Sequence, residues 1–504
     1  MSAAGTRSTP PWMIGCLLVA AALRLFRIGH QPLWIDEMIS LQLATYAQGA
    51  EFWRGLLSDI HGPFNSALLH GWILLGDSEG WLRSLYVIPA VATIPFLYRF
   101  VRDLFDEPAG RAAAWVLAIS PFHVWYSQEI RSYSWAILWT TITLWLFLRI
   151  WDGRRDAATW MGIAVTLSLS LLSNFSLVFL LVATSALIAV VRPHGRSTLL
   201  RWGGVLLFAG LVFLPWFLDW FSRMGEVLVT TEGRLGVPLR EAGGFSWSEI
   251  PYVGWSFAFG YSLGPSLQQL HLDRSVAALL PYAPVLLLGA LTVGICVASG
   301  LVQAGRRNRM VLVLGFLFIP LALAVLLATR NVKTFHPRYL IVVFPVFLAL
   351  VGVGWSRGGR VIRTAGWAGA ALMLVALGQH YFDPAYAKED SRSAARFIAE
   401  REAPGDSVVV IYSYRPFRHY FSDTGSGQAP LHHVHKRFLR TDEEMRSHVA
   451  DASEGASRVW LVLSRWWDVA PEAQIRRAFE ESLQEQDRWE FPGVKVTLYE
   501  GRRA

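Results

Sequence analysis

Long apolar runs, separated by short polar segments rich in arginine, dominate the first three quarters of this chain. A helix needs ~20 mostly apolar residues to cross the hydrocarbon core of a bilayer. Segment 64–76 is apolar but too short to cross, and it is better explained as an interfacial or re-entrant helix. The pattern predicts eleven membrane spans, near residues 11–28, 81–100, 112–124, 133–151, 159–174, 176–192, 202–218, 276–301, 310–328, 338–356 and 364–381.

The pattern changes at about Tyr381, and no further run is long enough to span a membrane. This last part holds 20 of the 38 acidic residues, which is typical of a solvated domain. Helical spacing and β-branched runs predict a small α/β domain. We expect helices at 391–402 and 471–487, and strands at 407–412, 458–463 and 494–499. The chain is therefore divided into a membrane domain, residues 1–381, and an α/β domain, residues 382–504.

Composition agrees with a multi-pass membrane protein. The chain is 53% hydrophobic and 17% charged, and it has 23 tryptophans, a residue enriched at the bilayer interface. Its net charge of +8 lies largely in short loops, so no nucleic-acid partner is implied. Cys16 and Cys296 each lie within an apolar run, which indicates buried thiols and neither a disulfide framework nor a cysteine metal site.

Arginines are concentrated in every second loop between the predicted spans. Short loops rich in Lys and Arg normally face the cytoplasm. The opposite, extracytoplasmic side then receives the loop with Asp36, the 125–132 loop, the 329–338 loop and the C-terminal domain. Arg131 and Arg338 are exceptions on that side and need a function. The loop arginines are Arg99, Arg102, Arg111, Arg149, Arg154, Arg155, Arg192, Arg196, Arg201, Arg306, Arg307, Arg309, Arg357, Arg360 and Arg363.

Two adjacent carboxylates, Asp36 and Glu37, follow the first predicted span. Charged groups at a membrane face are costly to bury and are usually functional. A carboxylate at such a place can accept a proton from a hydroxyl nucleophile. The alternative is that the pair only solvates the end of a loop.

Polar motifs recur in three further segments that the loop charges place on the same side. Their clustering on one face of the membrane favours a chemical site there rather than isolated solvated loops. The segments are His61-Gly-Pro-Phe-Asn65 with Gly76-Asp-Ser-Glu79 and Arg83, then Ser120 to Tyr133 with its Gln128-Glu-x-Arg131-x-Tyr133 motif, and Phe335-His-Pro-Arg-Tyr339.

Together these motifs resemble the polyprenyl-phosphate-sugar-dependent glycosyltransferases of the GT-C fold. The bacterial family 39 enzymes and the related aminoarabinose and protein O-mannosyl transferases are the most similar in pattern. The resemblance covers most of the first 390 residues and rests on the order and shared side of the motifs. Gly62 departs from the family, which commonly has a second proline there, and Asn65-Ser66 replaces common aromatic residues.

The resemblance implies transfer of a sugar from a polyprenyl-phosphate donor to a cell-envelope lipid, glycan or protein, with inversion at the anomeric carbon. Asp36 then corresponds to the general base, and Glu37 orients the base or the acceptor. Cationic and hydroxyl donors stabilise the charge that grows on the leaving phosphate. The expected donor-phosphate-binding residues are Arg131, Arg338, Tyr133, Tyr339 and His336, and the expected supporting residues are Gln128, Glu129, His61, Glu79 and Arg83.

Several of these residues also have a purely structural explanation. Glu129 and Arg131 could form an interfacial ion pair without a ligand, and Arg338 could anchor a helix end by extending its side chain to the interface. The cluster of His432, His433 and His435 could bind a metal or simply lie in a solvated loop. The resemblance requires no cofactor, assigns no metal ligand and leaves the use of a divalent metal ion open.

Two other functions compete with glycosyl transfer. A transporter or flippase of lipid-linked sugars would place ionisable residues near the middle of the bilayer, often within inverted repeats. Here the ionisable residues gather at one face, which favours chemistry on a lipid headgroup. A non-catalytic sensor that uses its C-terminal domain would leave the external Asp36, Arg131 and Arg338 unexplained.

Overall fold

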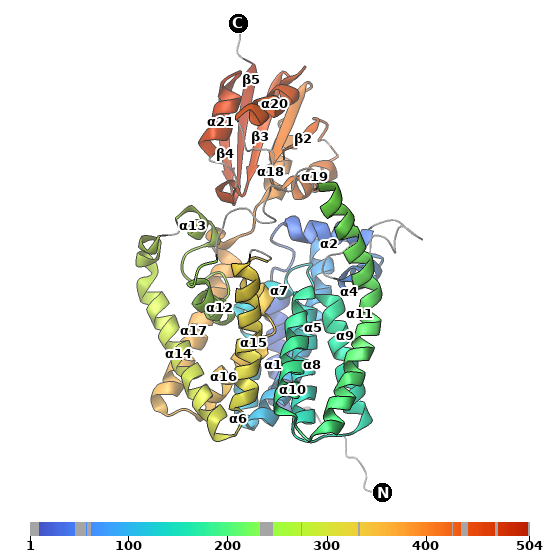
Figure 1. Ribbon diagram of the computed structural model, residues 1–504. Helices are drawn as coiled ribbons and strands as arrows, with labels where there is room; N and C mark the ends of the chain where they lie inside the picture. Colours follow the sequence, from blue (N-terminus) through green and yellow to red (C-terminus); the bar gives the residue numbers. More distant parts are fainter. Residues whose placement is uncertain are drawn as a thin grey trace. The chain divides into compact units, whose positions relative to one another are not determined.

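The computed structural model describes residues 10–45, 57, 62–231, 245–273, 275–330, 333–425, 427–434, 442–468 and 472–501, without the side chains of 223–231 and 442 (Figure 1). The chain forms two compact units. The helical unit comprises Met1–Ile28, Ser40–Leu263 and Pro284–Leu377, and the sheet unit comprises Gly29–Ile39, Gly264–Ala283 and Gly378–Ala504. The sheet unit thus starts near the predicted boundary at 381, and it also includes two segments from earlier in the chain.

Helices joined by short loops make up the membrane part over its described residues. Among these, six helices are long and apolar enough to cross a membrane, and four apolar helices are shorter. The long candidates are Glu79–Leu104, Tyr133–Trp151, Arg196–Ser222, Val276–Arg306, Met310–Thr329 and Arg360–Phe382. The helices are α1 Pro11–Leu25, α2 Ile35–Thr45, α4 Pro63–Ile73, α5 Glu79–Leu104, α6 Glu107–Ala118, α7 Pro121–Ser127, α8 Tyr133–Trp151, α9 Ala157–Ser173, η1 Phe175–Leu177, α10 Val178–Val191, α11 Arg196–Thr231, α12 Glu249–Phe259, α13 Leu267–Leu272, η2 Val276–Tyr282, α14 Ala283–Arg306, α15 Met310–Thr329, η3 Pro337–Leu340, α16 Phe344–Arg357, α17 Arg360–Phe382 and η4 Pro384–Tyr386.

The predicted span at 112–124 is not one helix but two short ones, α6 and α7. The Ser120 hydroxyl accepts from a backbone N–H of the first turn of α7, and Pro121 begins that helix, so both residues favour a helix start at this point. The buried Arg24 guanidinium donates to the last two carbonyls of α6, at 2.9 Å each, and so satisfies the end of that helix. The break allows the chain to turn before the Gln128-Glu-x-Arg131 motif.

The arginine-rich loops lie at one end of the helical unit, as the loop charges predict. Asp106, which begins α6, pairs with Arg307 after α14 at 3.1 Å and with Arg357 at the end of α16 at 2.8 Å. Arg309, before α15, forms two hydrogen bonds to Asp152, after α8, at 2.5 and 3.0 Å. The opposite ends of α8 and α15 therefore carry the loops that precede Tyr133 and follow Thr329. Those loops hold the two exceptional arginines.

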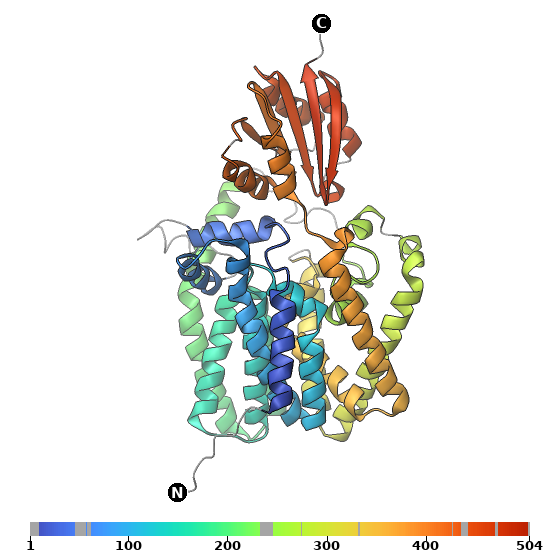
Figure 2. The ribbon, with the colours of Figure 1, turned by 180° about the vertical axis from the view of Figure 1, so that it is seen from behind.

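The sheet unit contains a five-stranded sheet in the order β2-β1-β3-β5-β4, seen from opposite sides in Figures 1 and 2. β1 is parallel to β2 and β3, and β5 is antiparallel to β3 and β4. Strands β1 and β3 are buried almost throughout, as expected for strands covered on both faces. The strands are β1 Asp406–Ile411, β2 Leu431–Val434, β3 Arg458–Ser464, β4 Leu483–Phe491 and β5 Val494–Gly501.

Helices cover both faces of this sheet. Val409 and Leu461 share one apolar core with Met445 of α20 and Ile475 of α21. The Trp460 side chain lies on the other face, against Phe397 of α18. The α/β prediction is thus confirmed, including the first helix and three of the strands. The helices are α18 Ser391–Ala399, α19 Tyr414–Asp423, α20 Asp442–Ser453 and α21 Glu472–Glu480.

The helix predicted at 471–487 is only partly correct, because α21 ends at Glu480 and β4 begins at Leu483. The charged, helix-favouring residues of β4 pair with β5 over its whole length, so tertiary pairing overrides their local preference. The prediction also omitted β2, α19 and α20. β2 is a four-residue strand whose sequence, Leu431-His-His-Val434, has little alternation.

A buried carboxylate ties the start of β1 to β3. Asp406 accepts two hydrogen bonds from Arg458, at 2.9 and 2.7 Å, one from Trp460 Nε1 at 2.8 Å and one from the Ala403 N–H at 3.0 Å. Burial alone would raise the pKa of Asp406, but these donors hold it below its ordinary value. A lowered pKa means that the folded domain favours the ionised form.

Asp406→Asn should destabilise the sheet unit by about 2 kcal/mol, because an amide replaces a charged acceptor of several buried donors. The wild-type contribution should be complete above the pKa of the unfolded carboxyl and should decrease as the pH falls through the lowered folded value. Thermal unfolding of both proteins at pH 7 and at pH 3–4 would measure this. The exposed pair of Glu481 and Arg446 provides the control, since Glu481→Gln should change stability by under about 0.5 kcal/mol.

Candidate active site

Arg131 lies in the loop between α7 and α8, at the end of the helical unit opposite the arginine-rich loops. Its side chain is only 8% exposed. One terminal nitrogen donates to Ser40 Oγ at 2.9 Å, and the guanidinium lies over the Tyr133 ring, 6.0 Å from its centroid. These contacts fix a buried cation in one orientation, which a snorkelling surface arginine would not require.

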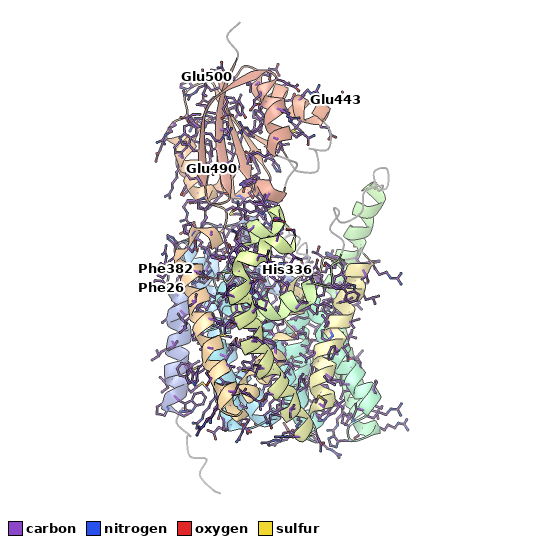
Figure 3. All side chains as sticks on the ribbon, turned by 90° about the vertical axis from the view of Figure 1, so that its left-hand side faces the viewer. Phe26, His336, Phe382, Glu443, Glu490 and Glu500 are labelled. Carbon is purple, nitrogen blue, oxygen red and sulfur yellow. The ribbon has the colours of Figure 1, made fainter. Side chains whose placement is uncertain are left out.

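Arg338 lies in the short helix η3, between α15 and α16. His336, labelled in Figure 3 toward one end of the helices, begins η3 by accepting from the Arg338 N–H at its Nδ1, at 3.2 Å. The Arg338 guanidinium donates to the Tyr339 hydroxyl at 3.2 Å and lies 5.1 Å from the centroid of that ring. The predicted group of Arg338, Tyr339 and His336 is therefore one connected cluster.

Two tyrosines connect the segments that carry the two arginines. The hydroxyls of Tyr126 and Tyr261 are 2.7 Å apart, the Tyr126 ring packs on Tyr133, and the Tyr261 ring packs near His336. Burial raises the pKa of Tyr126 and Tyr261 well above the ordinary value, and the nearby Glu129 raises both further. Both hydroxyls therefore remain protonated; one donates to the other, and the proton of the second can be donated to a further acceptor.

Lys333 also belongs to this cluster, although it was not among the residues predicted from the sequence. Its ammonium lies over the Tyr339 ring, 4.0 Å from the centroid. Burial lowers its pKa; Tyr339 acts in the opposite direction, and Arg338 lowers it further. The sequence did contain one indication of Lys333: it lies five residues before Arg338, in a loop on the side of the membrane where the other short loops carry few Lys or Arg residues. We call Arg131, Arg338, Lys333, Tyr126 and Tyr261 the cationic cluster.

The acidic pair is in the first turn of α2, and both residues belong to the sheet unit. Glu37 is fully buried, and its carboxylate pairs with Lys388 Nζ at 3.3 Å and accepts from the Trp34 N–H at 3.3 Å. Asp36 is partly exposed. The two carboxylates therefore have different environments, and Glu37 has a structural partner that the sequence did not indicate.

Helix α2 carries both the acidic pair and a partner of the cationic cluster. Ser40, which accepts from Arg131, follows Asp36 by four residues, so the two positions lie on the same face of this helix. The hydroxyl of Ser40 is buried, and it was not among the predicted site residues. A serine one helical turn after the acidic pair was the only signal for it in the sequence.

The predicted supporting residues have mixed positions. Gln128 donates to the carbonyls of Arg24 and Phe26, at 2.9 Å each, and thereby fixes the end of α1. Arg83 is buried; it pairs with Glu79 at 3.8 Å and donates to the Ile28 carbonyl at 3.0 Å. Their supporting role in catalysis remains a prediction. Glu129 is buried beside the tyrosines, and its predicted pairing with a cation also remains a prediction, while His61 lies outside the described residues.

The two departures from the family pattern have packing explanations. Gly62 has φ +97°, and a Cβ built there would lie 2.3 Å from the Leu172 carbonyl oxygen, so proline is incompatible with this backbone. Asn65 is buried in α4 and accepts from the Tyr86 hydroxyl of α5 at 3.0 Å. Both residues therefore set how α4 packs on its neighbours.

Metal ligation receives no support in the described residues, where no three His, Cys, Asp or Glu side chains lie together as possible ligands. His433 on β2 stacks on the Tyr414 ring at 4.5 Å, and His435 lies outside the described part of the chain. The cationic cluster itself has the charge and the donors that suit a phosphate.

Comparison with known proteins adds to this geometry. Residues 61–220 match the sequence profile of a family described as dolichyl-phosphate-mannose-protein mannosyltransferase. The crystal structure of ArnT from Cupriavidus metallidurans in the apo state has 14% sequence identity and a TM-score of 0.58, with 97% of each chain covered. The same protein bound to undecaprenyl phosphate has a TM-score of 0.57 at 14% identity, covering 97% of this chain and 98% of that one.

The chain has the GT-C fold. The predicted fold class and the resemblance drawn from the motifs are thereby confirmed. The profile match includes Glu79, Arg83 and Arg131 but neither Asp36 nor Arg338. No curated protein sequence matches this chain. The roles of individual residues therefore depend on the geometry described above.

Proposed function

We propose that this protein is an inverting membrane glycosyltransferase that takes a sugar from a polyprenyl-phosphate donor and attaches it to a lipid, glycan or protein of the cell envelope. The observation that carries the proposal is the cationic cluster at one end of a GT-C helical unit, in which Arg131 is buried and Arg338 and Lys333 are partly buried. The ArnT structure with undecaprenyl phosphate supports the same class of donor for this fold.

The cationic cluster is suited to a lipid phosphate. Arg131 and Arg338 offer planar forks of N–H donors, and each is held by a hydroxyl and an aromatic ring. Lys333 adds a third cation, and the two buried tyrosine hydroxyls remain protonated. Fixed donors stabilise a leaving phosphate without first having to reorganise, which is the largest contribution available to such a site.

Asp36 is the proposed general base. In one displacement, the acceptor oxygen or nitrogen bonds to the anomeric carbon while the bond from that carbon to the phosphate oxygen breaks. The acceptor's proton passes to the Asp36 carboxylate, and the electron pair of the broken bond remains on the polyprenyl phosphate. Attack from the face opposite the leaving group inverts the anomeric centre.

The position of the cluster favours this reaction over transport. The cluster belongs to loops and short helices beyond the ends of α8 and α15, whereas a transporter site is expected near the middle of the spans. Lipid headgroups lie at the ends of the spans, so the cluster suits chemistry at the headgroup.

Purified protein in proteoliposomes provides the test. Radiolabelled polyprenyl-phosphate sugars would be offered with total envelope lipid, glycan and protein extracts as acceptors, and mass spectrometry would compare envelope glycoconjugates from cells with and without the protein. We expect covalent transfer of label together with release of polyprenyl phosphate. Movement of intact donor between leaflets, without release of polyprenyl phosphate, would instead establish a flippase.

The acidic pair and the C-terminal domain are proposed to be extracytoplasmic. The support is the arginine-rich end of the helical unit, which the positive-inside rule assigns to the cytoplasm. An inner or plasma membrane with a lipid-linked donor in its outer leaflet is the corresponding location.

Single cysteines would test this orientation. Ser482 of the sheet unit and Ser197 at the start of α11 are both exposed, whereas native Cys16 and Cys296 are buried and should remain unlabelled. In sealed right-side-out vesicles, an impermeant thiol reagent should label Ser482→Cys strongly and Ser197→Cys weakly, and inside-out vesicles should give the reverse. Labelling of Ser197→Cys alone in right-side-out vesicles would invert the proposed topology.

A further inference from the structure

The residues before the acidic pair are held by side chains of the C-terminal domain. Arg392 donates to the carbonyls of His30 and Gln31, at 3.2 and 3.3 Å. The Tyr420 hydroxyl accepts from the Leu33 N–H at 2.7 Å, and the Arg392 guanidinium lies 5.4 Å from the Tyr420 ring centroid. All these groups belong to the sheet unit.

Lys388 contacts Glu37, the residue next to the proposed base Asp36. Its Nζ pairs with the buried Glu37 carboxylate at 3.3 Å, its backbone N–H donates to Gln31 Oε1 at 3.2 Å, and its ammonium lies 5.6 Å from the Trp34 ring. The Lys388 side chain is 8% exposed and that of Glu37 is 0% exposed. A pair this deeply buried is strongly coupled, because either charge alone would be left in a poorly solvated place.

From these contacts we infer that Lys388 is a positioning residue for the reaction, which it controls by holding Glu37 and thereby the first turn of α2. This inference rests on the proposed role of Asp36. The C-terminal domain is then an obligatory part of the catalytic apparatus rather than only a domain that selects acceptors. Arg392 and Tyr420 hold residues 30–33, which precede α2. Lys388 holds the first turn of α2, which carries the proposed base.

The reason is geometric. Asp36 and Glu37 are consecutive in one helical turn, so a shift of Glu37 must move the Asp36 backbone as well. A misplacement of about 1 Å can cost ~10²-fold in rate. Loss of the Lys388 ammonium would remove the 3.3 Å ion pair from the buried Glu37 carboxylate, and a shift of that carboxylate toward solvent would strain the turn that also carries Asp36.

The experiment compares Lys388→Ala, Lys388→Arg and a matched control, Lys495→Ala. Lys495 pairs with Glu472 at 2.7 Å in the same unit, on β5 and α21. We expect Lys388→Ala to lower kcat by roughly 10- to 100-fold with the donor KM within about threefold of wild type. Lys388→Arg should recover most of the rate, because it keeps the charge, and Lys495→Ala should match wild type.

Hydrogen exchange provides a readout that does not need activity. In Lys388→Ala, the amides of residues 29–39 should exchange faster, while those of β1 and β3 should be unchanged. A Glu37→Gln variant completes a double-mutant cycle, and the double variant should be no more than about threefold slower than the slower single variant, since one pair is being removed.

The outcomes separate this inference from the proposed function. Asp36→Asn, assayed in parallel, tests the base itself, and full activity in that variant would remove the proposed mechanism while the exchange result stood. Wild-type kcat and wild-type exchange in folded Lys388→Ala would overturn the positioning role. If Lys388→Ala does not accumulate, Lys388→Arg decides, because a kcat below a tenth of wild type with a normal Tm would contradict the charge pairing.

Discussion

Asp36→Asn should reduce glycosyl transfer by ~10²–10⁴-fold, the usual cost of removing a general base. Asparagine nearly preserves the size of the side chain but cannot accept the acceptor's proton. The Glu37–Lys388 pair should persist, because its contact does not include the Asp36 carboxylate, and Glu37 keeps a negative charge in the first turn of α2. Turnover with a saturating polyprenyl-phosphate sugar measures the effect, and donor binding by isothermal titration should change less than about threefold.

A matched control is Asp451→Asn, an exposed carboxylate on α20. It should leave transfer and Tm at wild-type values. Transfer by Asp36→Asn within a few-fold of wild type would exclude this carboxylate as the base. Glu37 would not replace it readily, because its carboxylate is already bound by Lys388.

Arg131→Ala should lower turnover by ~10²–10³-fold, the loss expected when one fixed donor to the developing charge is removed. Arg131→Lys should restore only part of the rate, because lysine keeps the charge but cannot donate with two parallel N–H groups. Donor affinity should fall as well, since the ground-state phosphate is already anionic. Binding of polyprenyl phosphate and single-turnover rates for the three proteins would separate the two effects.

Arg154 in a predicted cytoplasmic loop is the matched control, because it is an exposed arginine at the other end of the helical unit. Arg154→Ala should retain wild-type donor binding and turnover. Unchanged donor binding and turnover in Arg131→Ala would show that the contacts of this arginine, those with Tyr133 and Ser40 among them, are structural.

Much of the fold could be read from local sequence. Residues that lie in lipid are apolar, and loops that face the cytoplasm are rich in arginine. The length of an apolar run and the position of the arginines therefore predict where the spans lie and which loops lie at the same end, without knowledge of any contact. The β-branched runs at 407–412 and 458–463 indicated β1 and β3 for the same reason, because both strands are buried on both faces. The helix predicted at 471–487 was wrong beyond Glu480, where pairing with β5 decided the structure.

The candidate site was less accessible from sequence. The order of motifs indicated Asp36, Arg131 and Arg338 as candidates, because rare charges at a membrane face are visible in a single chain. Of the partners that hold the arginines, Tyr133, Tyr339 and His336 were predicted and Ser40 was not. Tyr261 and Lys333 resemble ordinary interfacial residues in the sequence, and only their contacts with Tyr126 and Tyr339 indicate a role.

The sequence alone therefore indicated a multi-pass membrane protein, the approximate positions of most of its apolar helices, and which carboxylates and arginines are candidates for chemistry. Tertiary structure decided how those groups are held. Lys388 is 351 residues from Glu37 along the chain, and a pair at that separation leaves no local periodicity or propensity signal. The ion pair forms only when folding brings these two distant segments together and buries both charges. No short segment of the sequence therefore carries a signal for it.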